Sequence, residues 1–505
     1  MLALSVIAFA LRTTSLSRSL FNDESYSLAL SQRSLGQMVT LFAYEANGTL
    51  YSIVLWPLTR LFGTSVELVR LPSVLAGAAS VPALWWCARQ FGGRRVAWVA
   101  AGLLAVNPMA VWYSQEARAY SFTVLAACLA FGALARALSV HGEAGGQAAD
   151  VRGGRAAWVG YVAAMAALAY CDLFAAPLAL PAQALLARKA GPAALRAWLR
   201  SLLALLVCCL PLLVFASISR SRRNALYWLP KTDRALAELA LQEFSAGFAK
   251  VSAVGWLTLL VGLVLVGVAL LRARGAAMAR ERSAMVVAAT WGLLPTVALL
   301  AVSFVEPLFW PRYVILSVPG LCLLAGLAAE RIWDSPRAMV PAAACVAALA
   351  ALAVFADARQ RDEVQQDWRP VAAWLSAERP AGQPTIIDSA QVLPSLGYYD
   401  RDFKATDGEL IVQEWRDLPL PAGVAGFKDR TGYGSVPNGP PSAATIAALA
   451  RRGAGTVWLI VSEVDTQLQS DPRTGAAMAW ARAHCHVEAR ESIGVWAMRA
   501  SGCTG

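Results

Sequence analysis

Two adjacent carboxylates stand near the start of the chain, in the stretch FNDESYSLAL at positions 21–30. Asp23 and Glu24 follow a hydrophobic opening, so the chain is expected to leave an apolar environment at this point. A carboxylate can take the proton from an incoming hydroxyl group, and a second acid beside it can orient it. The pair therefore indicates general-base chemistry. The simpler alternative is a solvated end of an apolar segment.

Further acids stand in two later polar clusters. Glu116 lies beside Arg118 and Tyr120 in the stretch YSQEARAY, and Asp172 ends the stretch YCD. A charge at the centre of a bilayer costs about 2.5–3.5 kcal/mol, so acids are cheaper at the ends of apolar segments. Each acid alone could be a solvated end or part of a salt bridge. Together with Asp23, however, they predict one polar cavity that opens to a single side of a membrane.

Basic residues in two stretches could bind a phosphate group. Arg312 and Tyr313 close the stretch VEPLFWPRY, and a guanidinium group can bind phosphate through two hydrogen bonds. Arg312 is therefore the leading candidate for a phosphate contact. The stretch SRSRRNALYWLPK adds Arg222, Arg223 and Lys231. These three could cradle a phosphorylated lipid or be attracted to anionic lipid headgroups, and both interpretations stay open.

The composition predicts a membrane protein with many spans. Of the 505 residues 57% are hydrophobic and only 15% are charged, with a mean hydropathy of +0.50. About a quarter of the residues in a typical soluble domain are charged. Apolar runs near the roughly 20 residues that cross a bilayer recur along the first 357 positions. We count about eleven: 1–11, 71–91, 96–113, 119–138, 156–170, 173–187, 202–217, 252–271, 284–303, 313–329 and 339–356.

The net charge of +11 is distributed in a way that argues against nucleic-acid binding. Most basic clusters lie in short connections on one side of the predicted bundle, which the positive-inside rule assigns to the cytoplasm. The candidate site residues then face the outside. The first outer segment is 12–70, and its residues 24–68 have helical apolar spacing, which predicts helices lying in the membrane interface.

The last part of the chain differs from the rest. It is more polar, and short apolar runs such as TVWLIV alternate with helix-like stretches such as PSAATIAALARRG. We therefore expect an all-α membrane domain at 1–357, followed by a small soluble α/β domain at 358–505. With the N-terminus inside, eleven spans put the second domain on the non-cytoplasmic side, periplasmic or lumenal. The location we expect is a bacterial inner membrane, with the site and this domain facing the periplasm. Cys485 and Cys503 fall in this domain, where a disulfide is permitted.

The ordered motifs resemble a known family. FNDESYS, LYSIVLWPLTRLFG and the long stretch ending in NPMAVWYSQEARAY occur in sequence between residue 21 and about residue 135. They are followed by PRYVILSVPGLCLLAGL (311–327) and DWRPVAAWL (367–375). This set is similar to the polyprenyl-phosphate-sugar-dependent membrane glycosyltransferases of the C-type fold, the group around protein O-mannosyltransferases and the lipid A aminoarabinose transferase.

The resemblance implies roles for the acids and the arginine. Asp23 would be the general base, and Glu24 would orient it or help to hold a divalent cation such as Mg²⁺ or Mn²⁺. Glu116 matches the second acidic site, which shapes the donor or metal site. Arg118 and Tyr120 would support it, and Arg312 would neutralise the leaving phosphate. Such enzymes generally invert the anomeric centre.

The sequence departs from the family at two places. Many relatives carry His-Pro-Pro before the Leu-Tyr pair that ends here at Tyr51, whereas this chain has Asn47-Gly48-Thr49. Asn47 can keep a hydrogen bond but is a poor metal ligand. Asp172 follows Tyr-Cys where relatives often have His-Tyr. We include Asn47, Tyr51, Asp172 and Tyr313 among the expected substrate-binding residues.

The expected partners are a polyprenyl-phosphate-linked sugar donor, a glycolipid, polysaccharide or protein acceptor, and membrane lipids. No nucleotide-binding motif is evident, which agrees with a lipid-linked donor. Two other functions remain possible, a secondary transporter and a non-catalytic protein of envelope-polysaccharide assembly. A transporter would place its substrate site near the middle of the bilayer, often between internal repeats. The acids here lie at span ends and no repeat is visible, so glycosyl transfer is favoured.

Overall fold

The computed structural model describes most of the 505-residue chain. The described residues are 1–42, 47–142, 148–221, 229, 232–249, 251–272, 279–333, 336–380, 382–389, 392–400, 410–413, 443–462 and 472–504. They form two compact units, one of Met1–Leu16 with Phe42–Glu363, the other of Ser17–Leu41 with Val364–Gly505. These units are defined by packing alone, so the membrane and extracytoplasmic domains expected at 1–357 and 358–505 stay a prediction.

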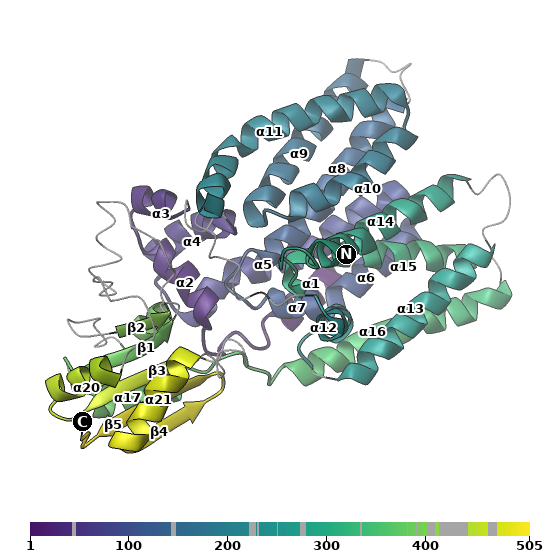
Figure 1. Cartoon of the computed structure of the whole chain (residues 1–505). Coiled ribbons are helices and arrows are strands. Elements are labelled where there is room, and N and C mark those ends of the chain that lie inside the picture. The colour runs from purple at the N-terminus through teal and green to yellow at the C-terminus, as the bar shows by residue number, and fades with distance from the viewer. Residues whose placement is uncertain are drawn as a thin grey trace. The chain divides into compact units, whose positions relative to one another are not determined.

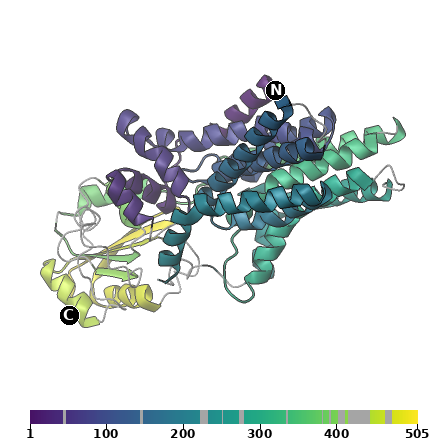
Figure 2. The same cartoon turned by 90° about the horizontal axis from the view of Figure 1, so that it is seen from above.

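The first unit is built from helices, of which long neighbours such as α8 and α9 run roughly side by side (Figures 1 and 2). They are α1 (Leu2–Arg12), α4 (Thr49–Phe62), α5 (Val66–Phe91), α6 (Arg94–Val106), α7 (Pro108–Tyr113), α8 (Tyr120–Gly142), α9 (Ala148–Cys171), α10 (Ala175–Lys189), α11 (Pro192–Ser221), α12 (Arg234–Ala246), α13 (Ser252–Arg272), α14 (Ala279–Val302), the 3₁₀ turn η2 (Pro311–Val314), α15 (Ser317–Trp333) and α16 (Pro336–Gln360).

Six helices within the described residues are long and apolar enough to cross a membrane. They are Val66–Phe91, Tyr120–Ser139, Pro192–Ile218, Ser252–Leu271, Arg282–Val302 and Met339–Gln360, and Leu2–Arg12 is a shorter apolar helix. The apolar windows of α5 and α8 are 67% and 72% buried, whereas those of α11, α13 and α16 are 22% buried. The first two therefore lie at the centre of the helical bundle, and the other three present apolar side chains outward. The expected total of eleven spans stays a prediction.

One predicted span is broken in the structure. The expected continuous segment 96–113 forms two helices, α6 and α7, because the chain is extended at Asn107. The residue before a proline disfavours helical backbone, and Pro108 suits the first position of the next helix. Asn107 Oδ1 also accepts a hydrogen bond from the Ala110 N–H at 2.9 Å and so caps α7. The break places the short α7 directly before the acidic turn at 114–119.

The second unit contains a mixed five-stranded sheet of order β2-β1-β3-β5-β4. Its strands are β1 (Thr385–Ser389), β2 (Leu410–Gln413), β3 (Val457–Ser462), β4 (His486–Ser492) and β5 (Val495–Ser501). The pairs β1–β2 and β1–β3 are parallel, and β3–β5 and β4–β5 are antiparallel. Its helices are α2 (Asn22–Ser31), α3 (Leu35–Leu41), α17 (Arg369–Glu378), α18 (Leu393–Tyr399), α20 (Ala443–Arg452) and α21 (Pro472–His484).

Strand β3 explains the layering of this unit. Its alternate side chains face opposite sides, because successive residues of a strand point to opposite faces. Leu459 packs with residues of α20 and α21, while Trp458 packs with residues of α17 and α18. The sheet thus lies between two helical layers, and TVWLIV forms a strand buried on both faces. The small α/β fold expected from the alternating apolar runs is present.

Two further expectations concern segments near the ends of the chain. The helical spacing of 24–68 corresponds to α2, α3 and α4, so its helical character is confirmed. Its position in a membrane interface stays a prediction. A disulfide joins Cys485 to Cys503 and connects the end of α21 to the chain after β5.

Candidate active site

The acidic turn between α7 and α8 is fixed by side chains from other helices. Gln115 Nε2 donates to the Leu11 carbonyl at 3.0 Å, and Ser73 Oγ on α5 donates to the Arg118 carbonyl at 2.9 Å. Arg12 Nε donates to Ser114 Oγ at 3.2 Å. The backbone of this turn is therefore held from two sides, by the end of α1 and by α5.

A glycine on α5 makes this close approach possible. A Cβ atom added at Gly77 would lie 2.1 Å from Ser114 Oγ and 2.9 Å from Arg12 Nε. Real Cβ atoms do not come this close to other heavy atoms, so the turn can contact α5 only because position 77 lacks a side chain. The missing side chain at position 77 thus leaves room for the turn that carries Glu116 to lie against α5.

Glu116 is buried at the centre of this turn. Its Oε1 accepts a hydrogen bond from Trp112 Nε1 at 2.7 Å, and the Trp112 ring stacks on Phe248 with centroids 4.3 Å apart. Tyr120, at the start of α8, packs edge to face against Tyr113. The Trp112 indole, itself held by stacking on Phe248, thus orients the carboxylate of Glu116.

A second acid, Glu243 on α12, joins this group. Tyr113 donates its hydroxyl to Glu243 Oε2 at 2.9 Å. Tyr113 lies within electrostatic range of Glu116, Glu243, Arg312 and Tyr120. We call these five residues, Tyr113, Glu116, Tyr120, Glu243 and Arg312, the acid–arginine cluster. The structure therefore brings together three of the residues predicted from the sequence, and adds two.

Burial raises the pKa of Glu243 from 4.5 to about 7. The hydrogen bond from Tyr113 and the positive charge of Arg312 act in the opposite direction. Sequence reasoning missed this acid, although it stands in an expected outer segment on a helix with an apolar stripe. The signal that could have found it is a single acid on the buried side of that helix, whereas Glu238 on the same helix pairs with Arg234 at the surface.

Arg312 lies on the 3₁₀ turn η2, where Pro311 occupies the first position. Its guanidinium carbon lies 5.9 Å from the centroid of the Tyr313 ring. Tyr313 is itself buried among apolar residues of α12 and α14, and its ring lies 6.1 Å from that of Phe174. The aromatic contacts link Arg312 to the turn that carries Asp172.

That turn connects α9 to α10 and is held by the segment that departs from the family pattern. Asn47 Oδ1 accepts from the Leu173 N–H at 3.1 Å, and Thr49 Oγ1 donates to the Tyr170 carbonyl at 3.2 Å. Asn47 thus holds the backbone beside Asp172, and a hydrogen bond from Asn47 to a substrate stays a prediction.

Asp172 is buried in this turn. Its Oδ1 accepts from the Phe174 N–H at 2.9 Å, and its Oδ2 is buried without a hydrogen-bond partner among the residues that the structure describes. Burial raises the pKa of Asp172 from 3.8 to about 7, while the backbone N–H groups of Phe174 and Ala175 act in the opposite direction. The carboxyl group can thus change its charge near neutral pH.

Two other expected site residues have clear structural contacts. Tyr51 is 1% exposed, donates its hydroxyl to the Val69 carbonyl and packs edge to face on Phe122. It therefore fixes α4 against α5 and α8. The Arg118 carbonyl is held by Ser73, which sets the end of the acidic turn. Substrate contacts by either residue stay a prediction.

The carboxylate pair Asp23–Glu24 belongs to the second unit, in the first turn of α2. Glu24 is fully buried, and its Oε2 accepts the Phe21 N–H at 3.2 Å. It thus satisfies one of the backbone donors that a helix leaves open at its start. Asp23 is half-buried, and its carbonyl accepts from Ser27 Oγ at 3.0 Å. The structure therefore gives the two acids different surroundings.

Some predictions cannot be placed. Arg222, Arg223 and Lys231 lie outside the described residues. Within the described part of the chain, no group of three or more histidine, cysteine, aspartate or glutamate residues could hold a metal ion. A divalent cation held by Glu24 and Glu116, which belong to different units, stays a prediction.

Comparison with known proteins finds relatives by structure. A scan against models of protein families finds no match, and a search of curated proteins finds none either. The crystal structure of ArnT from Cupriavidus metallidurans in the apo state matches with 16% identity and a TM-score of 0.60, covering 99% of this chain and 97% of that one. The same protein bound to undecaprenyl phosphate matches with a TM-score of 0.59 and the same coverage.

The oligosaccharyltransferase of Archaeoglobus fulgidus, tethered to an acceptor peptide, matches with 11% identity and a TM-score of 0.56, over 98% of this chain and 73% of that one. The chain has the C-type glycosyltransferase fold. The resemblance predicted from the sequence motifs is thus confirmed at the level of this fold. At these identities the matches show the fold alone.

Proposed function

We propose that the chain is an integral-membrane glycosyltransferase that moves a sugar from a polyprenyl-phosphate donor to an acceptor hydroxyl. The observation that supports this most is the acid–arginine cluster, in a fold shared with a protein whose structure contains undecaprenyl phosphate. The reaction would occur on the outer face of a bacterial inner membrane, and the acceptor would be a glycolipid, polysaccharide or protein.

The departing phosphate needs positive charge. In this proposal Arg312 binds it, because a guanidinium group forms strong, directional hydrogen bonds with phosphate oxygens. Glu243 lies within electrostatic range of Arg312, so its carboxylate form offsets part of the positive charge of the arginine. Arg222, Arg223 and Lys231 would add positive charge for the lipid phosphate. Tyr313 would hold the arginine in place through its ring.

The sugar of the donor needs partners for its hydroxyl groups. Glu116, oriented by the Trp112 indole, would accept hydrogen bonds from it. Asp172 offers the buried Oδ2 atom as a further acceptor. Arg118, Tyr120, Asn47 and Tyr51 would support these groups. If a divalent cation takes part, Glu24 and Glu116 are its proposed ligands.

Asp23 would be the general base. It would take the proton from the acceptor hydroxyl as the hydroxyl oxygen attacks the anomeric carbon, and the bond to the donor phosphate breaks in the same displacement. The lipid phosphate leaves with the bonding electrons, and the configuration inverts. We propose the roles of Asp23 and of the acid–arginine cluster from the chemistry of each group, taken separately.

The test uses the purified full-length protein in lipid nanodiscs, with sugar-labelled polyprenyl-phosphate glycolipids extracted from the source organism's membranes as donors. Asp23→Asn should lower the transfer rate by about a hundredfold or more. Arg312→Gln should lower it by roughly a hundredfold and also weaken the binding of undecaprenyl phosphate. Glu116→Gln should lower it as well. The control is Glu238→Gln, which makes the same acid-to-amide change on an exposed surface of α12.

The outcomes separate the possible functions. Full activity of both Asp23→Asn and Glu116→Gln would overturn the assignment of the site. Accumulation of a solute in proteoliposomes, without a glycosylated product, would instead identify a transporter. The glycan that disappears from a deletion strain would identify the acceptor class.

A further inference from the structure

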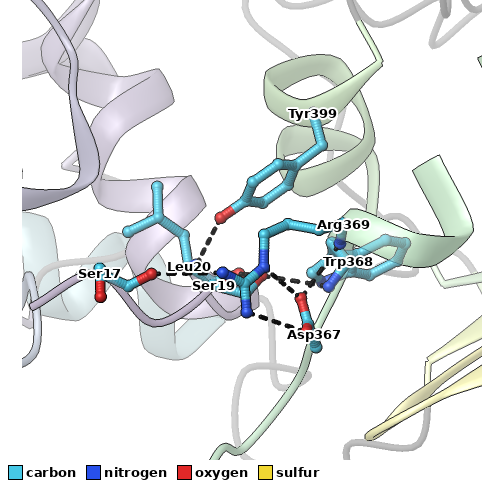
Figure 3. Close-up of polar contacts among 7 residues, drawn as sticks. All are labelled: Ser17, Ser19, Leu20, Asp367, Trp368, Arg369 and Tyr399. Carbon is cyan, nitrogen blue, oxygen red and sulfur yellow. Dashed lines mark hydrogen bonds and ion pairs between the residues drawn. The ribbon is translucent and has the colours of Figure 1, made fainter. Parts of the chain in front are cut away.

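Two motifs that lie far apart in the sequence are hydrogen-bonded to one another within the second unit. The backbone of residues 17–22, which leads into α2, contacts the stretch around DWR at 367–369 and the end of α18 (Figure 3). The Leu20 N–H donates to the Tyr399 hydroxyl at 2.7 Å. The Trp368 N–H donates to Ser19 Oγ at 3.1 Å.

The same contacts satisfy the start of α2. A helix leaves its first backbone N–H groups without partners inside the helix, and a buried N–H without a partner is costly. Here the Asn22 N–H donates to Gln366 Oε1 at 3.0 Å, and the preceding Phe21 N–H donates to Glu24. With Leu20, three consecutive N–H groups have side-chain acceptors, and two of the three acceptors come from residues 364–400.

An ion pair between Arg369 and Asp367 lies next to Gln366 and holds the segment 366–369 in place. Arg369 binds Asp367 through two hydrogen bonds, of 2.7 and 2.9 Å, and its third nitrogen donates to the Ser17 carbonyl at 3.4 Å. The Asp367 N–H donates to the Ile493 carbonyl at 2.8 Å, which attaches the motif to the turn between β4 and β5. The segment before α2 is thus connected to the sheet.

Burial makes these contacts specific. Ser19, Asn22 and Gln366 are each less than 5% exposed, and Trp368 is fully buried. Ser395 on α18 also donates to Asn22 Oδ1 at 3.0 Å. Water cannot easily replace a lost acceptor here, so removing one should loosen the first turn of α2.

We propose that Gln366 and Tyr399 are positioning residues for Asp23. Asp23 directly follows the three held residues 20–22, so the direction of its side chain depends on the backbone that Gln366 and Tyr399 fix. This inference rests on the proposed function for its catalytic consequence, because Asp23 is the base only in that proposal. The hydrogen bonds to Leu20 and Asn22 do not depend on it.

The first experiment measures structure and not activity. Hydrogen–deuterium exchange of peptides covering residues 18–31 is followed in wild type, Tyr399→Phe and Gln366→Leu. Both variants should exchange about tenfold faster or more in this segment, because the amides of Leu20 or Asn22 lose their acceptors. The matched control is Ser376→Ala, which removes a hydroxyl hydrogen bond to Asp400, at 2.9 Å, inside residues 364–505. Unchanged exchange in Tyr399→Phe and Gln366→Leu would overturn the inference.

The second experiment uses the transfer assay. Tyr399→Phe and Gln366→Leu should each lower kcat on the order of tenfold to a hundredfold, because Asp23 is then misplaced. The KM for the polyprenyl-phosphate donor should stay within about twofold. Ser376→Ala should keep both constants. Faster exchange with an unchanged kcat would show that the contacts are structural only, and would overturn a positioning role. Full activity of Asp23→Asn would reject the base of the proposed function, while exchange would still decide whether Gln366 and Tyr399 hold this segment.

Discussion

At the residue scale, the acid–arginine cluster contains two acids for one arginine. Glu116 is fixed by an indole donor, and Glu243 is fixed by a tyrosine hydroxyl. Burial favours the neutral form of Glu243, so its proton becomes labile near neutral pH. The charge beside Arg312 therefore depends on pH, and this can be measured without knowing the substrate.

Glu243→Gln should change how stability depends on pH. The folded protein holds the Glu243 proton up to about pH 7, whereas in the unfolded chain the group loses it near 4.5. The folded state thus binds more protons in this window, so the unfolding free energy falls as pH rises from about 4.5 to 7 and levels off above. This group contributes a fall of up to about 3 kcal/mol. The Glu243→Gln variant has no titrating carboxyl at this position, so its Tm should vary less with pH.

Glu238→Gln is the control, because this exposed acid pairs with Arg234 on the same helix. Its pH dependence of Tm should match that of wild type. Asp172 has a pKa that is raised in the same direction, so part of the slope should remain in Glu243→Gln. If Tm falls with pH as steeply in Glu243→Gln as in wild type, Glu243 does not retain its proton between about pH 4.5 and 7.

The sequence predicts some site residues and misses others for a physical reason. Glu116 and Arg312 are charged residues in short polar stretches between long apolar runs, with Tyr120 near Glu116, so these stretches stand out in the sequence. Glu243 follows Leu236 and Ala240 at helical spacing, so the sequence of α12 puts it on the apolar stripe, whereas Glu238 lies off that stripe. The pattern does not show which other helices pack against this stripe, so the contact with Tyr113 could not be predicted from it.

At the scale of elements, apolar runs predicted where the helices lie, but not where one of them breaks. The run 96–113 is apolar apart from Asn107 and is predicted as one span, yet Asn107 and Pro108 divide it into two helices. The Asn-Pro pair is a signal for a helix boundary. The prediction of one span followed the hydropathy of the run and did not use this signal. The break matters for the candidate site, because it places the short α7 directly before the acidic turn, which is held by α1 and α5.

Gly77→Ala tests how closely this turn must approach α5. The added Cβ would lie 2.1 Å from Ser114 Oγ, so the turn must shift. We expect a loss of about 1–3 kcal/mol in stability, typical of overpacking, together with lower transfer activity, because Glu116 moves with the turn. Thermal unfolding of the protein in nanodiscs and the transfer assay measure the two effects.

Gly102→Ala, on the neighbouring helix α6, is the matched control. Apart from the adjacent backbone of α6 itself, no heavy atom of the described residues lies within 4 Å of the Cβ that it would add, and the position is inside a helix. Alanine is there expected to be neutral or stabilising by about 0.5–1 kcal/mol. A Gly77→Ala variant as stable and active as Gly102→Ala would mean that the contact between α5 and the turn does not set the position of Glu116.

At the scale of the whole molecule, the charge pattern predicts which side of the membrane each loop faces. The basic stretches RQFGGRR (89–95), RGGR (152–155) and RARGAAMARER (272–282) lie in connections that an eleven-span arrangement places on one side. The disulfide between Cys485 and Cys503 agrees with an oxidising compartment for the second domain. Within the described residues six helices are long and apolar enough to span a membrane, but length and apolarity do not give the direction in which each one crosses.

Reporter fusions in a bacterial host test this orientation. Alkaline phosphatase folds only in the periplasm, so a fusion after Gly505 should be active, whereas green fluorescent protein at the same place should stay dark. Fusions after Gly191, in the basic connection between α10 and α11, should give the opposite result. Mass spectrometry of a non-reducing digest should find the linked Cys485–Cys503 peptide. A fluorescent fusion after Gly505 together with reduced Cys485 and Cys503 would place the second domain in the cytoplasm, and would remove the outward-facing site from the proposed function.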